Sequence, residues 1–313
     1  MVWSCSSLPG HANVGSGKRS TVVSLEQQLE FARKGHVCIR RLFSSAEIKL
    51  LRQRIQVQIC KEEEMLAAYK HRVSVLCPGI DLRSVQSVKQ ARALIQSKGN
   101  DDLGFLQMFH LHRRASSLDE FVFHPRVCQA AAELLGSNRV RLYQDCLFIK
   151  LPGFSVTNWH SDLNMVPLDT NSFLTFWIPL HSLSQTDSTL HFASASHTDF
   201  ALPYWQSNRG MDNLERRGYS IETYRELAAG DATVHHGWTL HFAPEQPVSS
   251  SSSRLAWTVS YFGDGARLLS TKHARRKVQD EDLVSFGGWF KDVKEGQVVR
   301  HKLLPLVYNN GFV

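Results

Sequence analysis

The stretch Asn158-Trp159-His160-Ser161-Asp162 decides which fold we expect for this chain. His160 and Asp162 are two positions apart, and side chains at this spacing point to the same face of an extended backbone. An imidazole and a carboxylate on one face are suitable ligands for a transition-metal ion. The stretch therefore predicts a metal site whose remaining protein ligand comes from another part of the chain.

A histidine-rich run at residues 230–241 offers that ligand. It contains His235, His236 and His241, and only one of the two consecutive histidines can face inward on a strand. Two histidines and one carboxylate form the facial triad of non-haem Fe(II) oxygenases, which leaves coordination positions open. At this point the three histidines remain alternatives for the third ligand.

Arg254 opens a predicted strand after this run. A guanidinium can hold a carboxylate through two parallel hydrogen bonds. A 2-oxoglutarate site needs such a fixed cation for the distal carboxylate, because the other end of the molecule chelates the metal. The pattern therefore predicts Fe(II) as the metal, with 2-oxoglutarate and molecular oxygen (O2) as cosubstrates.

The rest of the chain is read as the scaffold for these two stretches. Serine caps and closing glycines predict helices at residues 25–34, 45–64, 81–98 and 125–135, with Lys61-Glu62-Glu63-Glu64 as the solvated end of the second. Apolar patterns predict strands at residues 36–43, 105–111, 140–151, 173–180, 189–193, 232–236 and 254–262. Helices followed by many short strands predict an α+β fold with a mainly β core, a barrel or jelly roll with the N-terminal helices packed on one face.

We expect a flexible leader at residues 1–23 and a single domain at residues 24–313. The barrel core is placed at about residues 140–262, and residues 264–313 form a C-terminal extension. The leader is rich in Gly and Ser and contains Lys18 and Arg19 but no acidic residue, which is weakly compatible with an organelle transit peptide. The six cysteines are dispersed along the chain, which favours a reducing, cytoplasmic compartment. None forms a C-x-x-C pair, so we expect no zinc knuckle or thioredoxin-like site.

Composition limits the partners. Lys plus Arg exceed Asp plus Glu by 36 − 29 = 7, and the pI is about 9.1, which is explained either by an anionic small substrate or cosubstrate or by a basic surface alone. The basic residues are scattered, and the densest cluster, His273-Ala274-Arg275-Arg276-Lys277, is short, so we expect no nucleic-acid partner. The chain has no apolar run long enough to span a membrane, and we expect a monomer or homodimer without a membrane partner.

Taken together, these motifs resemble the phytanoyl-CoA dioxygenase family of Fe(II)/2-oxoglutarate oxygenases over roughly residues 24–262. Residues 31–39 are similar to the family's opening, residues 158–162 to its W-H-x-D motif, residues 230–241 to its distal-histidine segment and residues 254–256 to its R-x-A segment. Two segments depart from the pattern. Ala193 and Ala195 replace residues of its P-G-S-H turn, and Phe242-Ala243-Pro244 replaces its G-S-G after the histidine.

The resemblance implies a double-stranded β-helix with His160, Asp162 and His241 as iron ligands and Arg254 as the anchor for 2-oxoglutarate. It favours His241 over the other two histidines, and it places the aromatic ring of Trp177 beside the cosubstrate. The alternative for Trp177 is a position in the hydrophobic core.

Residues of the strand before the metal motif are further candidates. Gln144 and Lys150 are expected to contact the 1-carboxylate of 2-oxoglutarate or the substrate, although a solvated strand face explains both equally well.

The expected activity is hydroxylation of an unactivated C–H bond in a small molecule, with release of succinate and CO2. The same residues would also support desaturation or oxidative cyclisation. Two competing hypotheses are a cupin-like metal-dependent hydrolase or isomerase and a non-catalytic binding module. Neither of them gives Arg254 a role in 2-oxoglutarate turnover.

Overall fold

The computed structural model describes residues 21–99, 103–154, 156–199, 214–250, 252–270, 278 and 280–311. The larger of its sheets contains, in spatial order, β1 (His36–Ile39), β9 (Ala232–His236), β6 (Phe173–Pro179), β11 (Arg254–Gly263), β3 (Arg139–Lys150) and β13 (Leu306–Asn309), and β2 (Phe105–Phe109) also pairs with β3. The smaller sheet contains β4 (Thr157–His160), β10 (His241–Ala243), β7 (His191–Ala193) and β8 (Ile221–Thr223). All pairings are antiparallel, and a short third sheet joins β12 (Arg267–Leu268) to β5 (Leu168–Asp169).

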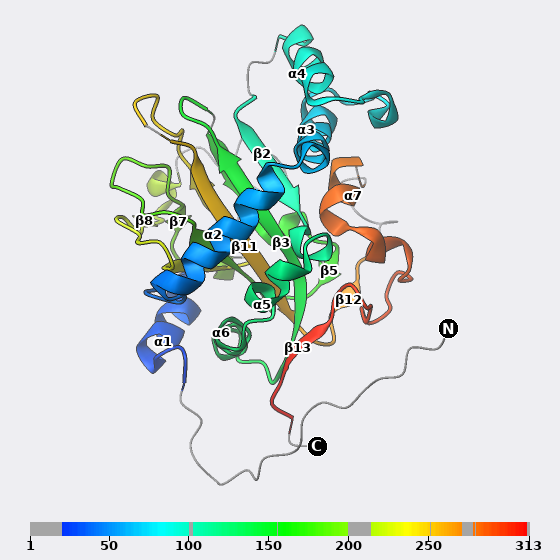
Figure 1. The fold of residues 1–313 in the computed structure, drawn as a ribbon. Helices are drawn as coiled ribbons and strands as arrows, with labels where there is room; N and C mark the ends of the chain where they lie inside the picture. Colours follow the sequence, from blue (N-terminus) through cyan, green and yellow to red (C-terminus); the bar gives the residue numbers. More distant parts are fainter. Residues whose placement is uncertain are drawn as a thin grey trace.

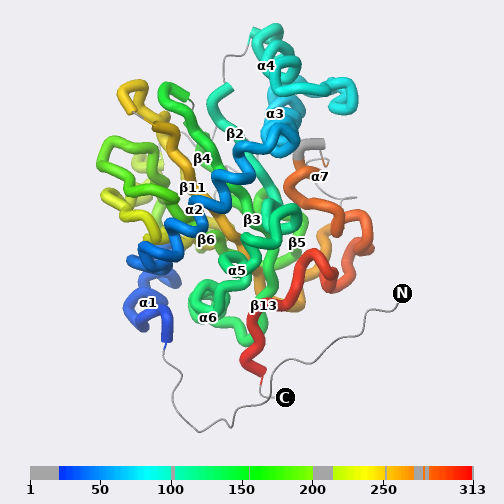
Figure 2. The backbone as a smooth tube through the Cα atoms, viewed as in Figure 1, coloured from blue at the N-terminus to red at the C-terminus, as the bar shows by residue number. Residues whose placement is uncertain are grey.

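The two sheets face each other around the interior of a jelly roll. His235 of the larger sheet and His241 of the smaller one have ring centroids 4.2 Å apart. Figure 2 shows the central strands β6, β11 and β3 side by side. The predicted fold class, a mainly β core arranged as a double-stranded β-helix, is therefore confirmed.

Helices cover the outer face of the larger sheet. The described helices are α1 (Leu25–Lys34), α2 (Ser45–Ile59), α3 (Glu62–Leu76), α4 (Val88–Ser97), α5 (Asp119–Val122), α6 (Pro125–Leu135) and α7 (Asp280–Phe286). Of these, α4 packs against α3 rather than against the sheet (Figure 1). Figure 1 shows α2, α5 and α6 in front of β11 and β3, with α3 and α7 near β2. The main core lies between these layers and includes Leu51 of α2, Ala131 of α6, Leu147 of β3 and Trp257 of β11. This arrangement leaves the other face of the sheet for the interior of the jelly roll.

Local capping fixes the first helix as the sequence predicts. Ser24 accepts a hydrogen bond from Gln27 in a capping box, and Gly35 ends the helix with a left-handed backbone at φ 80°. A Cβ at position 35 would lie 2.3 Å from Oγ1 of Thr239, so this close approach to the turn between β9 and β10 also requires glycine.

Two expectations about the helices are wrong. The helix predicted at residues 81–98 begins only at Val88, after the separate 3-10 helix Leu82–Ser84. The acidic run does not end the second helix. Instead, Lys61 precedes a new helix, α3, whose first turn contains Glu62, Glu63 and Glu64. Carboxylates stabilise a helix N-terminus through its dipole, so the same charges suit the beginning of a helix better than its end. Glu64 is also buried and accepts hydrogen bonds from Nε and Nη2 of Arg114, each at 2.7 Å.

The expected leader lies mostly outside the described residues, which begin at residue 21. Val22 and Val23 are held by Glu133, whose carboxylate accepts hydrogen bonds from both backbone amides. The domain boundary at residue 24 stays a prediction. Among the described residues, the helices are too short or too polar to cross a bilayer.

The register of the larger sheet places a row of polar side chains on its interior face. Gln144, Ser260, Thr175 and His235 are successive cross-strand partners from β3 to β9, and directly opposed residues share one face. The pairing of β3 with β11 shifts next to this row, and Tyr143 is left without a partner in a β-bulge. The bulge lets both Tyr143 and Gln144 turn inward.

Candidate metal centre

The structure brings His160, Asp162 and His241 together. His160 ends β4 and is the cross-strand partner of His241, which begins β10. Asp162 begins the short 3-10 helix η4 (Asp162–Asn164) directly after β4. One ligand atom from each of the three side chains lies within 4.8 Å of the other two. Oδ1 of Asp162 is 3.6 Å from Nε2 of His241 and 3.9 Å from Nε2 of His160.

Hydrogen bonds to backbone carbonyls fix the tautomers of both histidines. Nδ1 of His160 lies 2.7 Å from the carbonyl oxygen of Asn158, and Nδ1 of His241 lies 3.0 Å from that of Thr239. A carbonyl only accepts, so each Nδ1 carries the hydrogen and each Nε2 presents its lone pair. Burial holds the pKa of His241 well below its ordinary value, and this favours the neutral, metal-binding form.

The two oxygens of Asp162 have different surroundings. Oδ2 accepts a hydrogen bond from Oγ1 of Thr175 at 2.7 Å and a second from Nε2 of His235 at 3.1 Å. Burial alone would raise the pKa of Asp162, but the hydrogen bond from His235 and the nearby histidines hold it below its usual range. The carboxylate is therefore ionised, with Oδ1 left to face the two histidines.

The two competing histidines point in opposite directions. His235 is buried in the interior and contacts Asp162 rather than joining the three-residue group. His236 turns to the other face, where its Nε2 donates to the carbonyl oxygen of Asn171 at 2.7 Å. Sequence reasoning missed the roles of His235 and Thr175, although a polar residue inside the fully buried strand β6 is a signal that points to Thr175.

A buried guanidinium that forms no ion pair with any described residue marks the neighbouring part of the interior. Arg254 is 2 % exposed, and its Nε and Nη1 have no hydrogen-bond partner. Its guanidinium carbon lies 5.3 Å from the ring centroid of Trp177, which is also buried. Burial lowers the pKa of Arg254 to about 10, so the group remains charged at neutral pH. Leaving buried donors unsatisfied costs free energy, so an anionic ligand fits this position.

The two residues predicted on β3 both face the interior. Lys150 is fully buried, with Nζ 2.9 Å from the carbonyl oxygen of Pro244 and 3.2 Å from Oγ of Ser188, so the interpretation of a solvated strand face is wrong for it. Gln144 is half-buried, and its Oε1 has no hydrogen-bond partner. Its place in the row with Ser260 and Thr175 puts it beside the residues that hold Asp162.

Comparisons with solved structures concern the fold. The chain is similar in structure to the non-haem α-ketoglutarate-dependent carbocyclase SnoK from nogalamycin biosynthesis, with a TM-score of 0.65, 21 % identity and coverage of 93 % of this chain and 99 % of that chain. The epimerase SnoN, solved in complex with Fe3+, α-ketoglutarate and nogalamycin RO, gives a TM-score of 0.61, 18 % identity and coverage of 90 % and 97 %. EctD from S. alaskensis, solved with 2-oxoglutarate and 5-hydroxyectoine, gives a TM-score of 0.60 and 16 % identity, with coverage of 92 % of this chain and 91 % of that chain. These likenesses establish the shared fold.

The sequence comparison identifies the family. No curated protein matches the sequence significantly. The phytanoyl-CoA dioxygenase family, in contrast, matches over residues 31–256, which is most of the chain. The chain therefore belongs to the phytanoyl-CoA dioxygenase family and is a 2-oxoglutarate-dependent non-haem iron enzyme.

Proposed function

We propose that this enzyme hydroxylates an unactivated C–H bond of a small-molecule substrate and releases succinate and CO2. In this proposal His160, Asp162 and His241 bind Fe(II), and Arg254 anchors 2-oxoglutarate. The observation that carries the proposal is the buried, unpaired guanidinium of Arg254 in the same interior as the three-residue group. A metal-dependent hydrolase or isomerase would have no use for such a cation.

The donor set fits Fe(II). Two neutral imidazoles and one ionised carboxylate are the facial triad that leaves positions open for other ligands. The carbonyl oxygens of Asn158 and Thr239 orient the two imidazoles, while Thr175 and His235 orient the carboxylate. Such partners raise metal affinity because they fix each ligand before the metal arrives.

The cosubstrate site is proposed at Arg254, Trp177 and Gln144. Arg254 would bind the distal carboxylate through its unsatisfied Nε–H and Nη1–H groups, and Trp177 would hold the guanidinium in place from the ring face. Gln144 would donate from its side-chain amide to the 1-carboxylate or to the substrate. Bound together, iron and 2-oxoglutarate supply the oxidising chemistry, while the chain orients them and the substrate C–H bond.

The experiment that tests the proposal is an anaerobic titration of the protein with Fe(II) and 2-oxoglutarate. We expect a weak metal-to-ligand charge-transfer band in visible light, and succinate release when air and a pool of candidate metabolites are added. His160→Ala and Asp162→Ala should abolish both signals. Iron-loaded wild-type protein without the band would overturn the proposal and would favour a hydrolase, an isomerase or a binding module.

The same residues also serve desaturation or oxidative cyclisation, because substrate position separates these outcomes. Mass spectrometry of the product distinguishes them. A gain of one oxygen atom from labelled O2 supports hydroxylation, whereas a loss of two hydrogens without oxygen gain shows the alternative.

A further inference from the structure

The interior of the jelly roll continues past the metal centre, away from the proposed cosubstrate site. Arg254 begins β11, and Ser260 lies six residues later, beside Thr175, which bonds Asp162. Beyond Ser260, the strand runs past the bulge at Tyr143. There Tyr143 packs edge-on against Phe173 and Trp289, with ring centroids 5.3 Å and 6.4 Å away. This aromatic cluster therefore lies on the opposite side of the centre from Arg254.

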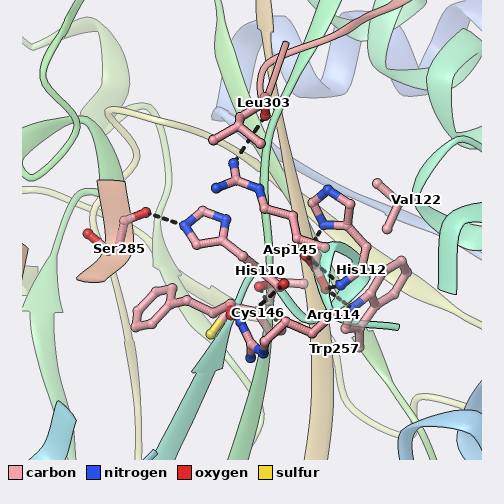
Figure 3. A network of polar contacts seen from close by, with 12 residues as sticks. His110, His112, Arg114, Val122, Asp145, Cys146, Trp257, Ser285 and Leu303 are labelled. Carbon is pink, nitrogen blue, oxygen red and sulfur yellow. Dashed lines mark hydrogen bonds and ion pairs between the residues drawn. The ribbon is translucent and has the colours of Figure 1, made fainter. Parts of the chain in front are cut away.

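A second guanidinium, that of Arg113, reaches this cluster from the short 3-10 helix η2 (Leu111–Arg113), because it bonds the carbonyl oxygen of Leu303, which packs against the cluster. A hydrogen bond from the ring of His112 to the fully buried carboxylate of Asp145 holds this helix in place. The same carboxylate accepts a hydrogen bond from Nε1 of Trp257 at 3.3 Å. Figure 3 shows His112 directed at Asp145, and His110 directed instead toward Ser285 of α7. With its neighbours held in this way, Arg113 has a defined position.

The guanidinium of Arg113 has few partners of its own. Its Nη2 donates to the carbonyl oxygen of Leu303 at 3.0 Å, and its buried Nε has no hydrogen-bond partner. Among the described residues, no carboxylate forms an ion pair with Arg113. Gly287 approaches this guanidinium closely, because a Cβ at position 287 would lie 2.5 Å from Nη1 of Arg113. The group is a half-buried cation with one unsatisfied donor. Burial lowers its pKa, and the fully buried carboxylate of Asp145 acts against that lowering.

A second N–H donor without an acceptor lies nearby in the chain. Trp289 is fully buried and follows Gly287 by two residues. Within the part of the chain that the structure describes, its Nε1 has no hydrogen-bond partner. The indole nitrogen can only donate, so its missing partner must be an acceptor.

Electrostatics connect this place to the metal centre. Burial raises the pKa of Tyr143, Arg113 opposes that rise, and the carboxylates of Asp282 and Asp162 add to it. Tyr143 also directly precedes Gln144, whose row contains Thr175, the hydrogen-bond partner of Asp162, so the cluster adjoins the metal centre.

We propose that Arg113 and Trp289 form a subsite for a carboxylate of the organic substrate. The inference rests on the proposed function, because it takes the side of the iron centre opposite Arg254 as the substrate side. An oxyanion supplies what both donors lack, and the neighbouring aromatic rings suit the apolar part of the molecule. The enzyme thus has one cationic anchor for the cosubstrate and another for the substrate.

The test compares phenylacetate with phenylacetamide, two probes of equal size that differ in charge. Each is titrated by calorimetry into the anaerobic protein saturated with Fe(II) and 2-oxoglutarate, so that Arg254 is already occupied. We expect phenylacetate to bind at least about tenfold more tightly than phenylacetamide. A hydrogen bond to a charged group contributes about 1.5 kcal/mol or more, and about 1.4 kcal/mol corresponds to a tenfold change in affinity. Arg113→Gln should remove the preference, and Trp289→Phe, which keeps a ring but not the N–H, should reduce it.

The matched control is Arg83→Gln, which removes one positive charge from an arginine whose side chain is 92 % exposed and should keep the preference. Equal binding of acid and amide by the wild type, no binding of either probe, or an unchanged preference in Arg113→Gln would each overturn the subsite. The charge-transfer band separates this outcome from failure of the proposed function, because Arg113→Gln should retain the band with 2-oxoglutarate.

Discussion

Nε2 of His235 donates a hydrogen bond to Oδ2 of Asp162 across 3.1 Å. The other oxygen of that carboxylate faces His241 at 3.6 Å. One histidine of the run 230–241 therefore lies in the three-residue group, and another orients the carboxylate of that group. The pair also contributes to the low pKa of Asp162.

We predict that His235→Phe weakens Fe(II) binding by about 10- to 100-fold, the usual effect of losing a group that orients a metal ligand. Thr175 still holds Asp162 in this variant, so binding should be reduced rather than abolished. Anaerobic Fe(II) titration measures the effect. His236→Phe is the matched control, since His236 faces away from the centre, and its affinity should equal that of the wild type. Wild-type affinity in His235→Phe would show that the hydrogen bond has no such role.

Arg254→Ala should raise the 2-oxoglutarate concentration needed for half-maximal succinate formation by about 10- to 100-fold, because a charge-assisted pair is lost. Iron binding should change little, since Arg254 contacts none of the three proposed ligands. Steady-state kinetics at varied 2-oxoglutarate check the prediction, with Arg83→Gln as the charge control. An unchanged requirement would mean that another residue anchors the cosubstrate.

The protein should lose stability as the pH falls from about 6.5 toward about 4. Burial lowers the pKa of His36 to about 4 from its ordinary value of 6.5. Below pH 6.5 the unfolded chain therefore binds a proton that the folded chain does not, and stability falls with pH by up to about 1.4 kcal/mol per unit for this group. His236, also lowered to about 4, acts with the same sign.

Unfolding temperatures measured across this pH range test the effect of His36. In His36→Asn the dependence on pH should be shallower, whatever the stability of the variant at neutral pH. A slope identical to that of the wild type would show that His36 does not contribute.

Asp145→Asn should lower the free energy of unfolding by about 1–3 kcal/mol, because an amide cannot accept from all the buried donors that the carboxylate accepts from. Asp145 is fully buried and bonds His112 and Trp257. Urea denaturation measures the change. Asp169→Asn, at an exposed position of β5, should have little effect. A loss for Asp145→Asn no larger than for Asp169→Asn would contradict the prediction.

The sequence predicted those features that depend on neighbouring residues. Ser24 and Gly35 bound α1 because a cap and a left-handed residue act within one turn. His160 and Asp162 share a site because two-residue spacing fixes their common face. The family resemblance favoured His241 among three candidate histidines, and the structure places His241 beside His160 and Asp162. Iron ligation by these residues stays a prediction.

Other features depend on which segments meet after folding. Lys150 was equally compatible with solvent, and its burial follows from the loop of Pro244 closing over it. The charges of the acidic run Glu62–Glu64 suit a helix start, but the burial of Glu64 depends on Arg114, which is distant in sequence. Local pattern contains no information about such partners.

The bulge at Tyr143 changes the reading frame of β3. Before it, odd-numbered side chains turn toward the interior, and after it, even-numbered ones do. Deleting Tyr143 would therefore remove the bulge and exchange the inward-facing and outward-facing side chains on one side of it. Either Gln144 would turn toward the helices, or Asp145 would lose its place under η2. An alignment of relatives with a gap at this position would mark enzymes whose substrate side is built differently.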